Sequence, residues 1–217
     1  MRQIRRIERS THLKIYLSPS DQSDNITATG TTEAEQCGRI ARACAKILNS
    51  RGHITLVGDN TKRKSYVARV KESNAMGADL HICIHTNAGG GDGTMVLCSS
   101  KSKDNKFVKS VYESVANLTP TMDNGIVVRD NLYEINATKA VCVYIEVEFH
   151  DRVETQKWIE ENIDNIALAI ANGITPKGDT VVYKVQIGAF TKRENAIALQ
   201  QALHKIGYEA IIKEERS

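Results

Sequence analysis

The sequence lacks the features that would place it among membrane or exported proteins. None of its hydrophobic runs approaches the roughly 20 residues that a membrane-spanning helix needs. The basic segment at residues 1–12 has no apolar stretch of signal-peptide length, so we expect synthesis in the cytoplasm without a leader. Only 3 prolines and 1 tryptophan occur among 217 residues, while 41% hydrophobic and 25% charged residues are ordinary for a globular domain. We therefore expect a soluble chain with no membrane partner.

The five cysteines form no Cys-x-x-Cys pair, the spacing typical of zinc and redox motifs. Cys37 and Cys44 lie seven residues apart on one face of an expected helix, and Cys83 and Cys142 lie within expected strands. We expect buried free thiols rather than disulfides or a metal cluster, which suits folding in a reducing compartment. The net charge of +3 is too small to indicate nucleic acid as a partner.

The most informative stretch runs from Ala78 to Ala88, just before a glycine-rich loop at residues 89–93. Two sets of side chains alternate in it, as in a strand that buries one face: Leu80, Ile82 and Ile84 against His81, Cys83 and His85. Such a strand carries His85 to its C-terminal end, where open α/β sheets place their ligand sites. The glycine loop lacks the Gly-Lys-Ser/Thr ending of a phosphate-binding loop, so we expect only a flexible rim of a cleft.

Hydrophobic periodicity predicts strands that alternate with helices, which is typical of a mostly parallel α/β sheet with helices on both faces. The expected strands cover residues 13–17, 53–57, 78–88, 93–98, 132–135 and 141–149, and the rest of 119–139 is expected to be irregular. Expected helices run from Thr31 or Thr32 to about Gly52, over 63–76 and over 104–118, followed by one long helix through Trp158 and Ile170. A linker at 175–180 then precedes a small C-terminal βαβ segment.

Three stretches together resemble the zinc-dependent N-acetylmuramoyl-L-alanine amidases (Amidase_3 family), which cut peptidoglycan and include phage and bacterial lysins. These are Thr-Glu-Ala-Glu at 32–35, His-Thr-Asn-Ala at 85–88 before the glycines, and Tyr-Ile-Glu-Val-Glu-Phe at 144–149. The resemblance covers roughly residues 13–174 and implies the same α/β architecture. It also implies hydrolysis of the amide between N-acetylmuramic acid and the L-alanine of the stem peptide.

The resemblance implies a zinc ion with three protein ligands. Glu33 and His85 match two of the ligand positions, and Asp21 stands where the family has the histidine of Asp-Pro-Gly-His. An aspartate would make the site harder and more anionic, which admits manganese or magnesium beside zinc. Gln22 and His150 are alternatives for this third position, and a degraded site in which Asp21 is only a turn residue stays open.

Glu146 matches the family's catalytic glutamate, which acts as general base and acid. Glu148 lies on the same face of the expected strand, about 6.6 Å further along, so periodicity alone does not separate the two carboxylates. We expect Asn87 and His150 to bind substrate. His81 lies about 13 Å from His85 along the strand, so we expect a buried or supporting histidine rather than a second ligand.

The C-terminal segment at 181–217 contains Val-Gln-Ile-Gly-Ala-Phe at 185–190, which resembles the opening of a SPOR domain, a module that binds peptidoglycan glycan strands. A complete domain of that type is βαββαβ, whereas this segment holds a single βαβ unit. Two strands bury little surface by themselves. We therefore expect a partial wall-binding module that pairs with a second copy in a homodimer.

The leading interpretation is a peptidoglycan amidase that reaches the cell wall after release, as a phage lysin or through mother-cell lysis. The first alternative is a non-catalytic peptidoglycan-binding protein on a degraded amidase fold. The second alternative is a different metal-dependent hydrolase on the same scaffold.

Overall fold

The computed structural model describes residues 12–176, 186–208 and 210–214. The chain divides into two compact units, residues 1–180 and 181–217, which are described separately. The boundary lies at the end of the expected linker, of which residues 177–180 are outside the described ranges, as are residues 1–11 of the basic extension. Within the described ranges, no helix has the length and apolar character needed to span a bilayer.

The first unit is built on a six-stranded sheet with the order β2-β1-β3-β6-β4-β5. Its strands are β1 (Lys14–Pro19), β2 (Ile54–Val57), β3 (Leu80–Asn87), β4 (Met95–Cys98), β5 (Gly125–Val128) and β6 (Val141–Phe149). Neighbouring strands run parallel except β4 and β6, which are antiparallel. The prediction of a mostly parallel sheet is confirmed.

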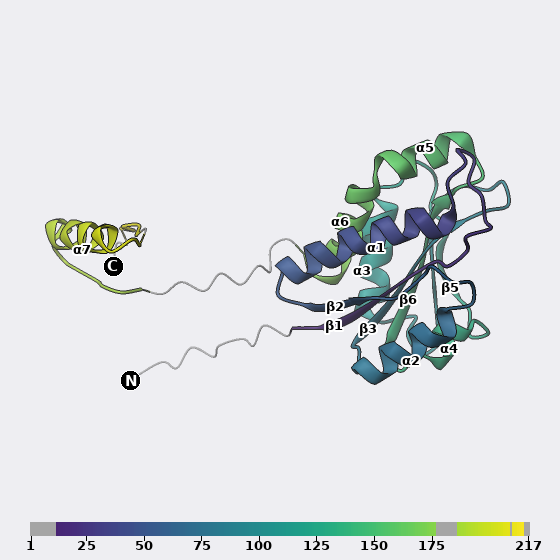
Figure 1. Cartoon of the computed structure of the whole chain (residues 1–217), viewed down its shortest axis with the longest axis horizontal. Helices are drawn as coiled ribbons and strands as arrows, with labels where there is room; N and C mark the ends of the chain where they lie inside the picture. The colour runs from purple at the N-terminus through teal and green to yellow at the C-terminus, as the bar shows by residue number, and fades with distance from the viewer. Residues whose placement is uncertain (1–11, 177–185, 209, 215–217) are drawn as a thin grey trace. The chain divides into compact units, whose positions relative to one another are not determined.

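Helices cover both faces of this sheet, as the alternation of strands and helices predicts (Figure 1). They are α1 (Glu33–Ser50), α2 (Tyr66–Met76), α3 (Lys106–Ala116), α4 (Tyr133–Ala137), α5 (Val153–Glu161) and α6 (Ile163–Ile174). The larger core joins α1, α3 and α6 to the apolar face of the sheet, which includes Leu80, Ile82 and Ile84 of β3. On the other face, beneath α2 and α4, a smaller apolar cluster contains Cys83, Leu97, Ile135 and Cys142.

The start of α1 is fixed by a side-chain cap, and this places Glu33 in the first turn of the helix. Thr32 is extended, and its hydroxyl accepts the backbone N–H of Glu35 at 3.1 Å. The predicted capping threonine is therefore confirmed. The helix ends at Ser50, and Gly52 follows with a φ of 86°, which glycine adopts without strain.

Just beyond α1, one arginine side chain holds the end of the first unit. The Nη1 of Arg51 donates to the carbonyl oxygens of Ala171 at 2.8 Å and Thr175 at 2.6 Å, and its Nη2 donates to the Oδ1 of Asn172 at 2.7 Å. The Ala171 carbonyl also accepts the backbone N–H of Thr175, so the bonds from Arg51 reinforce the C-terminal end of α6. We call this arrangement the Arg51 clamp.

Three local predictions are wrong. The expected strand at 132–135 begins the helix α4, which buries Glu134 and Ile135, because a short apolar run does not distinguish a strand from a helix. The segment expected to be irregular also contains β5. The expected long C-terminal helix is two helices, because Asn162, at a φ of −116°, ends α5 and precedes α6.

The first strand is longer than periodicity predicts. Ser18 and Pro19, expected in a turn, belong to β1 and pair with Cys83 and Ile84 of β3. All five cysteines lie in the described ranges, and each is buried and free, as predicted.

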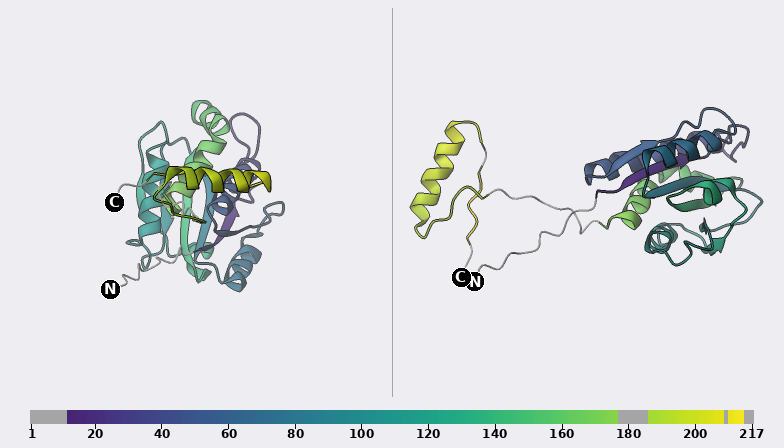
Figure 2. Two further views of the ribbon diagram at one scale, coloured as in Figure 1. Left: turned by 90° about the vertical axis from the view of Figure 1, so that its left-hand side faces the viewer. Right: turned by 90° about the horizontal axis from the view of Figure 1, so that it is seen from below.

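The second unit contains the predicted helix as α7 (Arg193–Lys205), drawn in Figure 2. None of the helix residues is buried. Residues 181–185 and 209 of the expected strands lie outside the described residues, and the described residues beside them form no strand. Large apolar side chains of this unit are exposed, among them Ile187, Ile206, Tyr208 and Ile211.

Candidate active site

Three predicted site residues meet at the C-terminal ends of β3 and β6. Glu33 comes from the first turn of α1, and its Oε1 lies 2.8 Å from the Nδ1 of His85 at the end of β3. His85 pairs in register with Glu146 of β6, so the two side chains project from the same face of the sheet. We call Glu33, His85 and Glu146 the outer cluster.

Glu33 is held as a carboxylate although it is only 1% exposed. Burial raises the pKa of this group, but hydrogen bonds from His85, Ser20 and Asn25 outweigh burial and leave the pKa below its usual value. The Nδ2 of Asn25 donates to Oε2 at 2.7 Å, while Oε1 faces His85. The position at the N-terminus of α1 also favours a negative charge.

The His85 ring is held by a contact at its Nδ1 atom and by an aromatic ring stacked on its face. Burial lowers the pKa of the imidazole, but the hydrogen bond with Glu33 and the charge of Glu146 outweigh burial and raise the pKa above its usual value. Tyr144 stacks on the ring with centroids 4.4 Å apart and an interplanar angle of 17°. The Nε2 atom is buried and has no hydrogen-bond partner among the described residues.

Glu146 is partly accessible to solvent and has one carboxylate oxygen without a hydrogen-bond partner among the described residues. The residue is partly exposed, yet its Oε2 is buried and no described residue hydrogen-bonds to it. Burial raises the pKa of this carboxyl to about 7, with a lowering influence from His85 and a raising one from Glu33. A carboxyl that titrates near neutral pH is suited to accept and return a proton.

The contacts of Glu146 and Glu148 show which of the two carboxylates lies beside His85, a choice that periodicity alone does not make. Glu148 is fully buried, and its carboxylate accepts the backbone N–H of Gly93 at 2.9 Å and the hydroxyl of Thr121. The pairing of β3 with β6 shifts between His85 and Asn87, and the shift removes Glu148 from the register of the histidine. Glu148 therefore supports the glycine-rich loop, and Glu146 stands beside His85.

Asp21 is buried, and its carboxylate contacts Ser65 and Arg69. Its Oδ2 accepts the backbone N–H of Ser65 at 2.7 Å and the Ser65 hydroxyl at 3.0 Å, and lies 3.5 Å from the Nη1 of Arg69. Within the described ranges, the group of three potential metal ligands whose ligand atoms all lie within 4.8 Å of one another contains none of Asp21, Glu33 and His85. The contact between Glu33 and His85 brings together two of the three predicted ligands, while Gln22 stays partly exposed.

The two predicted substrate-binding residues differ in access. Asn87 is partly exposed, and its Oδ1 accepts the N–H of Ala88 at 2.9 Å. His150 is fully buried: its Nδ1 lies 2.8 Å from the Oγ1 of Thr86, which also accepts from Gln36 at 2.7 Å. His150 therefore has no exposed surface through which a substrate could reach it.

The glycine-rich loop is anchored at its start. The Oδ2 of Asp151 accepts the N–H groups of Gly89 at 2.7 Å and Gly90 at 2.8 Å. Burial raises the pKa of Asp151, but these bonds outweigh burial and lower it. Both glycines have positive φ values, 117° and 74°, which side chains other than glycine rarely adopt. The rim expected to be flexible is thus tied to the residues that follow β6.

Sequence reasoning missed a second polar cluster on the same face of β3. The Nε2 of His81 lies 3.3 Å from the Oε1 of Glu134 on α4, and both side chains group with the Cys83 thiol. The Ser18 hydroxyl donates to Oε1 of Glu134 at 2.5 Å, and the Nε of Arg69 donates to Ser18 at 2.8 Å. We call His81, Cys83 and Glu134 the inner cluster. Strand alternation places the first two on one face, but no sequence pattern indicates that Glu134 joins them.

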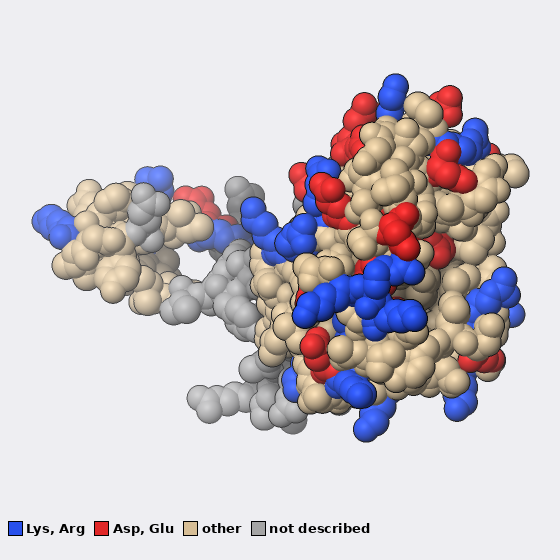
Figure 3. Space-filling model, turned by 45° about the vertical axis from the view of Figure 1, so that its right-hand side comes forward, with Lys and Arg blue, Asp and Glu red and all other residues tan. Residues whose placement is uncertain are grey.

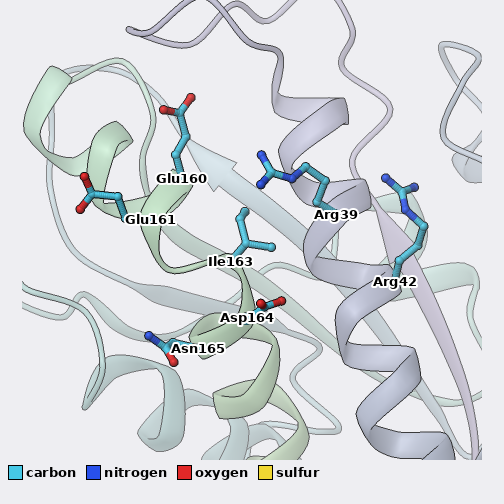
Figure 4. A pocket seen from close by; sticks show the side chains of 7 residues that line it. All are labelled: Arg39, Arg42, Glu160, Glu161, Ile163, Asp164 and Asn165. Carbon is cyan, nitrogen blue, oxygen red and sulfur yellow. The ribbon is translucent and has the colours of Figure 1, made fainter.

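A surface hollow lies apart from both clusters, between α1 and the junction of α5 and α6 (Figure 4). Its lining residues are Arg39, Arg42, Glu160, Glu161, Ile163, Asp164 and Asn165. No residue of the outer cluster lines it. Figure 3 shows basic side chains gathered in the middle of one face and acidic ones mostly above them. The outer cluster, not this hollow, is therefore the candidate active site.

Sequence comparison connects this geometry to known proteins. The profile of the N-acetylmuramoyl-L-alanine amidase family matches residues 19–176, and that of the SPOR domain matches residues 164–217. The N-acetylmuramoyl-L-alanine amidase CwlM of Bacillus licheniformis is 24% identical over 214 residues, which cover 92% of this chain and 84% of the relative. A sporulation-specific N-acetylmuramoyl-L-alanine amidase of Bacillus subtilis (strain 168) is 26% identical over 216 residues, with the same coverage.

Solved structures share the fold. The catalytic domain of CwlV, an N-acetylmuramoyl-L-alanine amidase from Bacillus (Paenibacillus) polymyxa var. colistinus, superposes with a TM-score of 0.70 at 19% identity, covering 78% of this chain and 99% of that domain. An N-acetylmuramoyl-L-alanine amidase from Clostridium difficile 630 gives a TM-score of 0.69 at 20% identity, with 79% and 99% covered. Since the family profile spans more than half of its residues, the chain belongs to the N-acetylmuramoyl-L-alanine amidase family.

Proposed function

We propose that the chain hydrolyses the amide between N-acetylmuramic acid and L-alanine in peptidoglycan, with the outer cluster as its active site. Membership of the amidase family supports the reaction, and relatives named as amidases disfavour the non-catalytic alternative. The observation that carries the proposal is the contact between Glu33 and His85, 2.8 Å apart, beside the unpartnered Oε2 of Glu146.

The outer cluster fits zinc at two ligand positions. Glu33 and His85 are buried, come from different elements and direct ligand atoms at each other, and carboxylate with imidazole is a common donor set for zinc. We propose Asp21 as the third ligand; the hydrogen bonds from described residues to its carboxylate all end on Oδ2. A bound zinc ion supplies Lewis-acid polarisation of the scissile carbonyl.

The protein's own groups have distinct roles in the proposed reaction. Glu146 takes a proton from the attacking water and returns it to the departing nitrogen of L-alanine, which its pKa of about 7 permits near neutral pH. Tyr144 holds the plane of the His85 ring by stacking. Asn87, at the partly exposed strand end, contacts the substrate, while buried His150 positions Thr86 beside it.

The reaction is tested by digesting purified peptidoglycan and identifying the bond that is cut. We expect new amino groups on L-alanine without new reducing sugar ends. New amino groups on another residue would show a different hydrolase, and no cleavage with metal-loaded protein would return the chain to the non-catalytic alternative. Glu146→Gln is the inactive control.

The third ligand is tested by elemental analysis of protein purified without chelator. We expect about one fewer zinc ion per chain for Asp21→Ala, and an unchanged content for Asp59→Ala, a nearby exposed aspartate. Unchanged zinc in Asp21→Ala would exclude Asp21. A loss in Gln22→Ala or His150→Ala would then identify the ligand.

We further propose that residues 181–217 bind glycan strands at the cell wall and pair with a second copy of the chain. The SPOR match and the exposed apolar side chains of this unit, such as Ile206 and Tyr208, support the proposal. Light scattering of the full chain at micromolar concentration is expected to show a dimer. A strict monomer would contradict the pairing, and glycan binding is measured separately by pelleting with insoluble peptidoglycan.

A further inference from the structure

The inner cluster has the composition of a metal site and lies apart from the proposed active site. His81, Cys83 and Glu134 supply an imidazole, a thiol and a carboxylate, and their ligand atoms all lie within 4.8 Å of one another. His81 and Cys83 are fully buried and Glu134 is 7% exposed. These are the nitrogen, sulfur and oxygen ligands that zinc accepts in proteins. The cluster shares no residue with Glu33, His85 or Glu146.

The hydrogen bonding of the inner cluster is incomplete for groups so deeply buried. The Nδ1 of His81 has no partner among the residues that the structure describes. The Cys83 thiol contacts another thiol, that of Cys142, with their Sγ atoms 3.8 Å apart. Buried polar atoms usually find hydrogen-bond partners, so the unpartnered Nδ1 of His81 needs an explanation.

Both oxygens of Glu134 have a neighbour in the metal-free cluster. The Nη2 of Arg69 lies 3.9 Å from Oε2, and the Nε2 of His81 lies 3.3 Å from Oε1. Oε1 also accepts the Ser18 hydroxyl, so an ion bound here takes the place of the contact between His81 and Glu134. Burial raises the pKa of Glu134, but the bond with His81 and the charge of Arg69 outweigh burial, so the group is held ionised.

We propose that His81, Cys83 and Glu134 bind a buried zinc ion, and that the thiol of Cys142, which lies outside the 4.8 Å group but 3.8 Å from that of Cys83, shifts into the fourth position. Two thiolates on a tetrahedral zinc with Zn–S bonds of about 2.3 Å lie about 3.8 Å apart, which matches the separation of Cys83 and Cys142. The thiols release their protons to solvent when the ion binds. Because all four positions are filled by protein and the cluster is buried, the ion is structural and joins β3, β6 and α4.

Burial also predicts how this ion is exchanged. An ion enclosed beneath α2 and α4 enters while the chain folds and leaves when it unfolds. A chelator should therefore remove metal from the partly accessible outer cluster and leave the inner one loaded until denaturant is added. This order of removal distinguishes the two sites without reference to activity.

The test uses the full chain carrying Glu33→Gln and His85→Gln, which remove the proposed catalytic ligands. Grown with cobalt in place of zinc, this variant should retain about one metal ion per chain and show sulfur-to-cobalt charge-transfer absorption. Adding Cys83→Ala should abolish both signals. Adding Cys44→Ala, which changes a buried cysteine of α1 in the larger core, should leave both. Absence of metal in the starting variant, or cobalt without the sulfur band, would overturn the proposal.

A second measurement keeps the test decisive if Cys83→Ala does not fold, as judged by circular dichroism. The unmutated chain grown with cobalt should itself show the sulfur band, because the outer cluster and Asp21 contain no thiol. An unmutated chain that binds cobalt without that band has no thiolate ligand, and this result also overturns the proposal. Peptidoglycan cleavage is not a readout here, so failure of the proposed amidase reaction would leave the result unaffected.

Discussion

The outer and inner clusters are built alike but differ in access. In each, a ring nitrogen of a β3 histidine lies close to a carboxylate oxygen of a glutamate on a helix. The distance is 2.8 Å between His85 and Glu33 and 3.3 Å between His81 and Glu134. The outer pair lies at the strand end beside the partly exposed Glu146, whereas the inner pair is covered by α2 and α4. Both pairs are buried, so the difference in access comes from Glu146, which lies beside His85 and, among the described residues, has no counterpart at His81, four residues earlier on the strand.

This difference shows how a parallel sheet divides its polar residues. At the C-terminal edge, strand ends and loops leave room for a ligand, so an uncommitted group such as the Oε2 of Glu146 is available for chemistry. Further inside, the same residue types are surrounded by Ser18, Arg69 and Tyr16, whose ring stacks on His81 with centroids 5.2 Å apart. There they contribute to stability.

The largest expected effect is on catalysis in the outer cluster. Glu146→Gln should lower the rate of peptidoglycan cleavage by about 10²–10⁴-fold, because the amide cannot accept the proton of the attacking water. Its unfolding transition at neutral pH should not fall below that of the unmutated chain. The measurement is the initial rate of L-alanine amino-group release, with thermal unfolding in parallel.

Glu148→Gln is the matched control, two residues along the same strand. It weakens the bonds to Gly93 and Thr121, so it should lower the unfolding temperature while retaining most of the cleavage rate. If Glu148→Gln abolished cleavage and Glu146→Gln did not, the assignment of the general base would be reversed.

The next effect is on stability, in the surroundings of the inner cluster. Arg69 is 2% exposed and faces the carboxylates of Asp21 and Glu134, so Arg69→Met leaves two buried acids without their cation. Removing one partner of a buried ion pair costs about 3–5 kcal/mol. The free energy of unfolding from urea titration should fall by that amount. Arg63→Met, which removes an exposed pair with Asp24, should change it little; equal losses in both variants would contradict the comparison.

The two clusters should respond to pH with opposite sign in metal-free protein. The pKa of Glu146 is raised to about 7, so the folded state holds this proton more tightly, and the associated stability is lost as pH rises from about 4 toward 7. The pKa of Glu134 is lowered, because the bond with His81 outweighs burial, so its stability is present at neutral pH and lost as pH falls.

Urea titrations from about pH 3 to 8 measure this contrast. From about pH 4 to 7, Glu146→Gln should become more stable relative to the unmutated chain as pH rises. Below about pH 5, Glu134→Gln should become less stable relative to the unmutated chain as pH rises, with no further change above that pH. Parallel trends for the two variants would show that the clusters do not differ in this way.

The smallest expected effect is on the stability of the first turn of α1, which carries Glu33. Thr32→Ala removes the hydroxyl that accepts the Glu35 N–H, and loss of such a cap costs about 1 kcal/mol. Thr32→Ser retains the cap and should behave like the unmutated chain in urea titration. An alanine variant as stable as the serine variant would show that the start of α1 is held by other contacts.

Periodicity and capping predicted the sheet, the start of α1 and the position of His85, because each depends on local sequence. The choice between Glu146 and Glu148 required the register shift after His85, which depends on how two distant strands pair. The inner cluster required α4 to be a helix, and its five residues are too few to show a helical period. The orientation of Asp21 depends on Ser65 and Arg69, which no local pattern brings near it.

The Arg51 clamp has a mechanical consequence. If residues 181–217 hold a glycan strand, a pull on the chain reaches the first unit at Thr175, where the clamp makes its last hydrogen bond. The load passes through Arg51 to the C-terminal end of α1, and the opposite end of that helix carries Glu33. Because Glu33 contacts His85, tension that displaced this helix would also disturb the outer cluster.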